Sequence, residues 1–239
     1  FASANKGTNL DVTADLSQLV LSNSNYYVSG VTTALKANIA AAPIVIGGLS
    51  AADKVYNRNA VAVLTGTPVI ASGLLGSDAA TLSGAATAGT FADSNVGAGI
   101  AVTPTLTGLS LSNSNYFITG IDAAMTAAIT PAPVTVSGLS VANKVYDATT
   151  AATMSGTPTA FGVLTGDTAA VSGAVSGAFV SADAGTSIAV TANLAGLSLS
   201  NSNYQITGMT AALAADIAAA PLTVTADNKS MVYGSTSPV

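Results

Sequence analysis

Apolar and polar residues alternate along three long stretches of the chain, the pattern of strands that turn one face to a core. Each stretch begins at a glycine that follows a phenylalanine by six residues, at Phe1, Phe91 and Phe179. The apolar positions are Leu10, Val12, Ala14 and Leu16, then Ile100, Val102, Pro104 and Leu106, then Ile188, Val190, Ala192 and Leu194. The pattern predicts three equivalent strands, with Phe91 and Phe179 as structural residues beside them.

A polar segment closes each of these stretches. The sequence Ser-Asn-Ser-Asn-Tyr occurs at residues 22–26, 112–116 and 200–204, at spacings of 90 and 88 residues. A period of about 90 residues is the size of one β-sandwich domain. The chain is therefore interpreted as a tandem array in which this segment marks a turn.

The tyrosine that ends the turn opens a further strand in each copy. The position after it is Tyr27, Phe117 or Gln205, so we predict that this position faces outward. The tyrosine itself does not vary, and we predict that it faces the core and that its hydroxyl bonds to a nearby backbone group. These core tyrosines are Tyr26, Tyr116 and Tyr204.

An Ala-Pro pair before an apolar burst sets the boundaries of the repeats. The prolines are Pro43, Pro133 and Pro221, and residues 44–46, 134–136 and 222–224 follow them. We therefore predict half of a repeat at 1–43, complete repeats at 44–133 and 134–221, and the start of another at 222–239.

The alanine-rich end of each repeat is the one ambiguous element. Alanine favours helix, so residues 211–220 fit a short helix. However, Leu35, Ala37 and Ile39 alternate with polar residues, and the segments are short and closed by proline. We interpret them as strands. About seven short strands per repeat, separated by Gly, Ser and Asn, predict an all-β chain of tandem Ig-like β-sandwiches arranged as beads in a rod.

Composition and charge exclude several classes of function. The chain has 239 residues and a net charge of −5, with six basic residues, eleven acidic residues and no His or Cys. So few basic residues argue against nucleic acid or anionic lipid as a partner. Polar residues interrupt every apolar run before the roughly 20 residues of a membrane helix, so we expect no transmembrane segment.

The sequence contains few of the residues that catalytic sites use. Without His or Cys, nucleophilic mechanisms that use these residues are excluded, as are tight zinc sites. Two pairs of carboxylates, Asp78 with Asp93 and Asp167 with Asp183, are candidates for glycoside hydrolysis by their equivalence between repeats. Because they lie in loops beside Gly or Ala, we favour a role in turns. We expect a protein without enzymatic activity.

Calcium is the one cofactor that the sequence allows. Oxygen ligands suffice for it, and Asp53, Asn57 and Asp147 are weak candidates, although no cluster of three acids occurs in a short segment. Lys54 and Lys144 are conceivable donors for isopeptide bonds, but no glutamate is present to assist. We therefore expect no cofactor other than calcium.

One motif resembles a known family. Residues 54–57 read Lys-Val-Tyr-Asn and residues 144–150 read Lys-Val-Tyr-Asp-Ala-Thr-Thr, each about ten residues after a boundary proline. Together with Gly166-Asp167, Phe179, Ala184-Gly185 and Asn203-Tyr204, they resemble the YDG repeat of bacterial filamentous-haemagglutinin-like adhesins. Tyr56 and Tyr146 are then structural residues of the motif. The signature glycine is replaced by Arg58 and Ala148, so we expect a different turn type in place of one that needs positive φ.

The end of the chain resembles another repeat of the same adhesins. Residues 226–229, Val232-Tyr233-Gly234 and Pro238 are similar to the opening of MBG repeats. The resemblance implies a secreted surface protein, located outside the bacterial cell, in which such domains form a stalk or fibre. We expect this chain to be a window of a longer polypeptide, because Phe1 falls inside a repeat and no signal peptide is visible there.

Three hypotheses for function follow. The first is a structural stalk or fibre, whose partners are copies of itself or neighbouring repeats, laterally or end to end, since its strands carry few charges against association. The second is a module that binds glycans or host surfaces through exposed Tyr27 and Phe117. The third is a filament subunit that donates a strand to the next copy.

Overall fold

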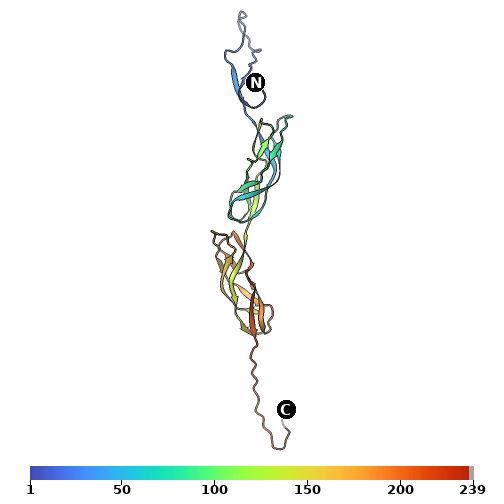
Figure 1. Cartoon of the computed structure of the whole chain (residues 1–239), viewed down its shortest axis with the longest axis vertical. Coiled ribbons are helices and arrows are strands. Elements are labelled where there is room, and N and C mark those ends of the chain that lie inside the picture. Colours follow the sequence, from blue (N-terminus) through green and yellow to red (C-terminus); the bar gives the residue numbers. More distant parts are fainter. Residues whose placement is uncertain (237–239) are drawn as a thin grey trace. The chain divides into compact units, whose positions relative to one another are not determined.

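The computed structural model describes residues 1–236, which belong to two compact units, Phe1–Thr130 and Pro131–Val239. Every regular element in the described residues is a β-strand, and none is a helix (Figure 1). The predicted all-β class is confirmed. The alanine-rich segments form strands β2 (Leu35–Ile39), β11 (Met125–Thr130) and β21 (Leu213–Ala218), as their alternation indicated.

The second unit forms two main sheets. One has three strands in the order β15-β12-β20, and the other has five in the order β13-β21-β18-β17-β14. The strand β16 pairs separately with β19. The strands are β12 (Ala132–Val141), β13 (Lys144–Val145), β14 (Ala151–Ala152), β15 (Met154–Phe161), β16 (Val171–Gly173), β17 (Ser176–Phe179), β18 (Gly185–Asn193), β19 (Leu197–Leu199), β20 (Tyr204–Met209) and β21.

The core of this unit lies where β12 of the three-stranded sheet contacts β21 of the five-stranded sheet. Val134 and Val136 of β12 and Ile217 of β21 are almost fully buried. Phe179 and Val190 pack in one cluster with Ile217. The alternation predicted for residues 188–194 holds at Val190, which is buried while its neighbours Ala189 and Thr191 are exposed.

The first unit repeats this plan in residues 42–130. Its strands are β3 (Ala42–Ala51), β4 (Lys54–Val55), β5 (Val61–Ser72), β6 (Leu82–Gly84), β7 (Ala88–Phe91), β8 (Gly97–Pro104), β9 (Leu109–Leu111), β10 (Tyr116–Ile121) and β11. Here β5 is one long strand that pairs first with β7 and then with β3. It therefore joins the two sheets into one of seven strands, whereas β14 and β15 divide the same path in the second unit.

Both repeats close in the same way. The first strand pairs in parallel with the penultimate one, β3 with β10 and β12 with β20. Pro43 and Pro133 lie at the second position of β3 and β12, close to the strand start, where proline is better tolerated than in the strand interior. The strands β3 and β12 therefore include these prolines, and the second compact unit begins at Pro131.

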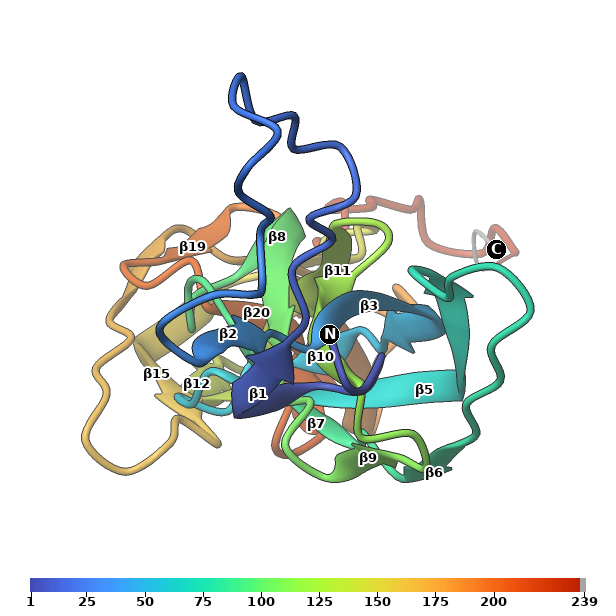
Figure 2. The ribbon, with the colours of Figure 1, turned by 90° about the horizontal axis from the view of Figure 1, so that it is seen from above.

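The two ends of the described chain lack this closure. Residues 1–41 form only β1 (Gly7–Val12) paired with β2, and residues 13–34 between them contain no strand (Figure 2). Residues 219–236 also contain no strand, and Pro221 is exposed. Pro238 and the rest of 237–239, part of the predicted repeat at 222–239, lie outside the described residues.

Candidate functional site

The lysine of the repeated motif is held inside a ring of oxygen atoms. In the second unit, Lys144 Nζ donates to Asp147 Oδ1 at 2.6 Å, to the Thr149 carbonyl at 2.8 Å and to the Ala151 carbonyl at 3.3 Å. It also contacts Thr149 Oγ1 at 3.1 Å and lies 5.7 Å from the centroid of the Phe179 ring. The Lys144 side chain is only 17% exposed. This lysine therefore fixes the loop of residues 145–150 onto the core, and we call the arrangement the lysine clip.

The first unit contains the same clip with different ligands. Lys54 Nζ donates to the Asn59 carbonyl at 2.7 Å, to Asn59 Oδ1 at 2.9 Å and to the Val61 carbonyl at 3.1 Å. The Phe91 ring centroid again lies 5.7 Å away. Burial lowers the pKa of Lys54. Because the clip survives the change of its side-chain ligands, its constant elements are the lysine, the phenylalanine and the two backbone carbonyls five and seven residues after the lysine.

The turn inside the clip keeps positive φ without glycine. Arg58 has φ of 69° and Ala148 has φ of 61°, at the position where the YDG signature has glycine. The prediction of a different turn type is wrong. The side chain of the preceding residue compensates, because Asn57 Oδ1 accepts the Asn59 N–H at 3.3 Å and Asp147 Oδ1 accepts the Thr149 N–H at 2.9 Å.

Restoring glycine at this position is expected to stabilise each repeat. A non-glycine residue in the left-handed region costs about 1–2 kcal/mol, and the greater freedom of glycine in the unfolded chain returns about 0.4–1 kcal/mol of that. Ala148→Gly and Arg58→Gly should each raise the free energy of unfolding by about 0.5–1 kcal/mol. Urea denaturation measures this, and Ala195→Gly in an exposed turn is the control. A loss of stability in both variants would contradict the assigned backbone conformation.

Asp147 titrates far below its usual range. The hydrogen bond from Lys144, together with those from the backbone and side chain of Thr149, lowers the pKa of Asp147 from 3.8 to about 2. A lowered folded-state pKa means that the stabilisation is complete above the unfolded value and disappears as the pH falls through the folded one. The clip of the second unit is therefore sensitive to acid between about pH 4 and pH 2.

NMR titration of the Asp147 carboxyl carbon should give a midpoint near pH 2, and Lys144→Met should move the midpoint up toward 3.8. The clip of the first unit has Asn57 at the equivalent position, so the amides of residues 54–61 should show no such transition. A midpoint near 3.8 in the unmodified chain would show that the ion pair does not form in solution.

The recurring tyrosine of each complete repeat bonds to a loop. Tyr116 Oη donates to Asp78 Oδ2 at 2.7 Å and accepts the Leu75 N–H at 3.1 Å. Tyr204 Oη donates to Asp167 Oδ2 at 2.6 Å and accepts the Leu164 N–H at 3.2 Å. The Leu75 bond favours the phenolate, but the Asp78 hydrogen bond, burial and the Asp78 charge together raise the pKa of Tyr116.

Burial separates the tyrosines that were predicted to be structural. Tyr116 and Tyr204 are 5% and 4% exposed, in agreement with the prediction of inward-facing rings and hydroxyls bonded to the backbone. Tyr26 is 71% exposed, so the prediction of a core position is wrong for this copy. The reason is that residues 1–25 contain no counterparts of β3 and of the loop around Asp78, against which Tyr116 packs.

The other predicted structural residues also differ between the repeats. Phe91 and Phe179 are both 3% exposed and form the floor of the clips. Tyr56 is buried, whereas Tyr146 is 41% exposed. Both tyrosines bond through the backbone to the last strand, with the Tyr56 N–H donating to the Thr130 carbonyl and the Tyr146 N–H to the Ala218 carbonyl. The constant role of this tyrosine position is thus the backbone contact.

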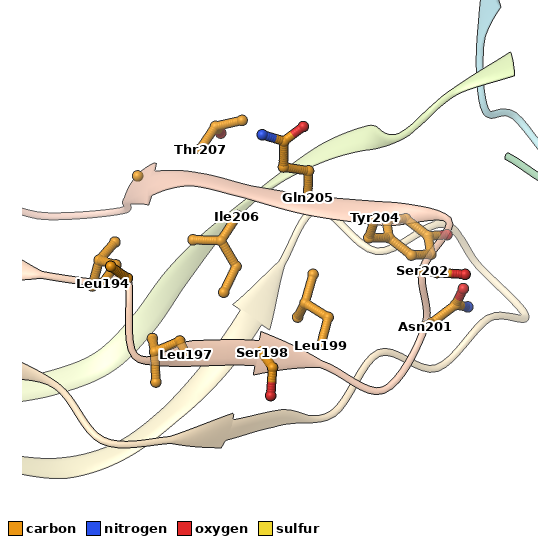
Figure 3. Close-up of a pocket in the computed structure, with 12 residues that line it drawn as sticks. Leu194, Leu197, Ser198, Leu199, Asn201, Ser202, Tyr204, Gln205, Ile206 and Thr207 are labelled. Carbon is orange, nitrogen blue, oxygen red and sulfur yellow. The ribbon is translucent and has the colours of Figure 1, made fainter. Parts of the chain in front are cut away.

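An open groove lies between the strands β19 and β20 (Figure 3). These consecutive strands belong to different sheets, because β19 pairs with β16 and β20 lies at the edge of the sheet β15-β12-β20. Leu199 and Ile206 extend into the space between them, which has a volume of about 480 Å³. None of the lining residues is charged: Leu194, Ala195, Leu197, Ser198, Leu199, Asn201, Ser202, Tyr204, Gln205, Ile206, Thr207 and Gly208.

The same groove recurs in the other two copies. Between β9 and β10 it has a volume of about 520 Å³ and is lined by Leu106, Leu109, Leu111 and Ile118 among others. In the N-terminal copy it has about 400 Å³, and Leu16, Leu19, Leu21 and Val28 occupy the equivalent positions. Three leucines and one β-branched residue are therefore constant. The alternation in the sequence predicted that the first of these leucines, Leu16, Leu106 or Leu194, faces inward, but not that the four residues leave a groove open to solvent.

The predicted calcium ligands bond within the protein. Asp53 Oδ1 accepts the Ala128 N–H at 2.6 Å, and Asn143 Oδ1 makes the equivalent bond to the Asp216 N–H at 2.8 Å. Because an amide replaces the carboxylate, this contact does not depend on charge. Asn57 and Asp147 belong to the clips. Within residues 1–236, no three acidic, histidine or cysteine side chains gather in a group suited to a metal ion.

The predicted carboxylate pairs serve separate turns. Asp78 and Asp167 accept the tyrosine hydroxyls described above. Asp93 Oδ1 accepts the Asn95 N–H at 3.0 Å, and Asp183 Oδ2 accepts the Ser181 hydroxyl at 3.1 Å. This agrees with the favoured role in turns.

The described residues contain no helix that is long and apolar enough to cross a membrane.

The architecture is that of a tandem all-β repeat protein. The side chains of the repeated motifs bond to groups of their own repeat. The YDG domain matches residues 40–126 and 130–211, which is more than half of the chain. The chain therefore belongs to the YDG domain family, as the resemblance in residues 54–57 and 144–150 indicated. No curated protein and no solved structure matches it.

Proposed function

We propose that the chain is a structural repeat region of a secreted bacterial surface adhesin or extracellular filament, in which the repeats act as a stalk and carry out no catalysis. The observation that supports this most is the use of the repeated polar residues. Lys54 and Lys144 hold loops, Tyr116 and Tyr204 bond to loops, and the aspartates cap turns. Side chains that recur in each repeat thus maintain the fold of that repeat.

The pairing of terminal strands supports a load-bearing role. In each complete repeat the first strand, β3 or β12, is paired in parallel with the penultimate strand, β10 or β20. A pull along the chain loads these parallel strands in shear, so several hydrogen bonds break together rather than one after another. We extend the proposal to the MBG-like start of a further repeat at 222–239, which would continue the stalk.

Single-molecule force spectroscopy of the full chain tests this function. Stretching should give two separate unfolding events, one for each complete repeat. Each event should release about 300–320 Å of chain less the length of the folded repeat, since about 90 residues extend by about 3.3–3.6 Å each. Extension without resolvable force peaks would exclude a stalk that carries load.

The second candidate function is recognition of a glycan or host surface. The observation that favours it is the exposure of aromatic rings at equivalent positions, with Phe117 at 48% and Tyr27 at 84%. Gln205 replaces them in the third copy. If these rings bind glycans, Phe117→Ala should lower the signal on a glycan array while the melting temperature stays constant, and Gln205→Ala serves as the matched control.

A further inference from the structure

The last asparagine of the Ser-Asn-Ser-Asn-Tyr turn contacts the copy of the repeat that precedes it. Asn115 Oδ1 of the first complete repeat accepts the Lys6 N–H at 2.9 Å, and Asn115 Nδ2 donates to Asn5 Oδ1 at 2.8 Å. Asn5 and Lys6 belong to the N-terminal copy, and all three residues lie in the first compact unit. We call these two hydrogen bonds the asparagine latch.

The rest of this turn is bonded within its own repeat. Asn113 Oδ1 accepts the Asn115 N–H at 3.0 Å, and Asn113 Nδ2 donates to the Ala79 carbonyl at 3.3 Å. Ser112 Oγ accepts the Thr81 N–H at 2.8 Å. Because these bonds fix the turn, the carboxamide of Asn115 is held in place to bind the preceding copy.

The loop that the latch binds has the same conformation in all three copies. The side chain two residues earlier accepts a backbone N–H at 3.0 Å each time, in the pairs Ser3 with Asn5, Asp93 with Asn95, and Ser181 with Asp183. The residue after the phenylalanine also donates its N–H to β1, β8 or β18. The loop of residues 1–7 therefore forms without the strands that the N-terminal copy lacks.

The residue types at the two positions of the latch preserve its chemistry. Asparagine occupies positions 25, 115 and 203, while positions 5, 95 and 183 hold asparagine, asparagine and aspartate. An amide offers both a donor and an acceptor, and a carboxylate keeps the acceptor oxygen. An array that repeats this sequence therefore repeats a pair of side chains that can form the latch.

The latch adds a second attachment to a joint that is already short. Residues 40 and 41 alone separate β2 from β3, and the Ala42 N–H donates to the Asn115 carbonyl at 2.7 Å. The covalent link by itself permits twisting, whereas the latch holds the Asn5 loop at a different point. Both bonds are exposed, so each contributes little in isolation. Because the linker keeps the partners together, their effective concentration is high and the latch closes.

We propose that the asparagine latch stiffens the joint between residues 1–41 and the repeat at 42–130. The Asn115 carboxamide recognises the loop of the preceding copy by a backbone N–H and an adjacent amide oxygen. This inference rests on the proposed function and deepens it, since a stalk that projects from a surface has to resist bending at its joints. The turn at 112–116 thus serves its own repeat through Ser112 and Asn113 and the joint through Asn115.

Double electron–electron resonance of the full chain tests the latch. The chain has no cysteine, so spin labels at Thr8→Cys and Val63→Cys, two exposed strand positions on either side of the joint, attach at these sites alone. The distance distribution should be narrow and should widen in Asn115→Ala, whereas Ser114→Ala in the same turn is the matched control and should leave it unchanged. Equal widths in the unmodified chain and in Asn115→Ala overturn the proposal.

Hydrogen exchange measures the same opening at the acceptor loop. The Lys6 amide should exchange about tenfold faster in Asn115→Ala, which corresponds to about 1.4 kcal/mol. Amides of β3 and β10 should keep their protection, because the bonds within the repeat remain. An unchanged Lys6 exchange rate would show that the bond to Asn115 does not form in solution.

Exchange of amide for carboxylate separates the latch from a general effect on the turn. Asn115→Asp alone should keep the distribution narrow, because the Asn5 amide can turn its Nδ2 toward the new carboxylate. Asn5→Asp alone should also keep it, since the carboxylate still accepts from Asn115 Nδ2. The double variant places two carboxylates together and should widen the distribution as Asn115→Ala does. A double variant no wider than the two single variants overturns the proposal.

These results are distinguishable from the test of the stalk. A joint that is equally wide with and without Asn115, in a chain that unfolds in two force events, removes the latch and leaves the stalk. A joint that widens in Asn115→Ala, in a chain without force peaks, removes the stalk that carries load and leaves the latch.

Discussion

Gly156→Ala is expected to destabilise the second repeat by about 2–6 kcal/mol, a large share of the stability of a small domain. Gly156 in β15 has φ of 93°, and a Cβ atom there would lie 2.1 Å from the Gly138 carbonyl oxygen. Gly138 has φ of 80° and lies where the pairing of β12 with β15 shifts register. The backbone conformation contributes about 1–3 kcal/mol and displacement of the carbonyl contributes about 1–3 kcal/mol.

Hydrogen exchange of the full chain measures this effect locally. Peptides from β12 and β15 should lose protection, and those from β3 and β5 in the unmodified first unit serve as an internal reference. Gly208→Ala in β20 is the control, because its added Cβ meets no atom within 4 Å, and it should be neutral or slightly stabilising. Unchanged protection of β15 in Gly156→Ala would show that the close approach of the two strands is not present in solution.

The repeat and its strands could be predicted because three copies of the same pattern are present. Comparison of Tyr27, Phe117 and Gln205 identified an outward position without any related sequence, and all three are exposed. Alternation around Leu35 and Ile39 outweighed the helix preference of alanine, since short segments closed by proline cannot form a stable helix. The all-β class follows from local patterns that agree with one another.

The clip could not be predicted because its ligands are not constant. Asn59 in one repeat and Asp147 with Thr149 in the other complete the same ring of oxygens around a lysine. Most of the ligands are backbone carbonyls, which carry no signal in the sequence. The positive φ of Arg58 and Ala148 was missed for a related reason, since the rule that such turns need glycine neglects the hydrogen bond from the preceding side chain.

The N-terminal copy shows the limit of reasoning by equivalence. Tyr26 has the same neighbours in sequence as Tyr116, yet it is exposed. Burial of Tyr116 depends on residues that lie about 40 positions earlier, at Leu75 and Asp78. A strand motif therefore specifies a preference for burial, and the partner strands decide whether it is met.

Lys144→Met should cost the second repeat at least about 2 kcal/mol, because it removes hydrogen bonds from a charged donor that are each worth about 1.5–3 kcal/mol, and packing of the methionine side chain offsets only part of this loss. The substitution leaves Asp147 Oδ1 and the carbonyls of Thr149 and Ala151 without their shared donor. It also removes the ammonium from the face of Phe179, a contact worth about 0.5–2 kcal/mol. Lys54→Met should have a similar effect on the first unit.

Lys36→Met separates the clip from an ordinary ion pair. Lys36 Nζ lies 2.5 Å from Asp11 Oδ1, as close as Lys144 lies to Asp147, but the two side chains are 47% and 69% exposed. Such a pair is worth at most about 1 kcal/mol. In urea denaturation, Lys36→Met should therefore lower the free energy of unfolding much less than Lys54→Met and Lys144→Met do. Equal losses in Lys36→Met and Lys144→Met would mean that the ring of oxygens adds nothing to the ion pair and that the motif lysine is a surface residue.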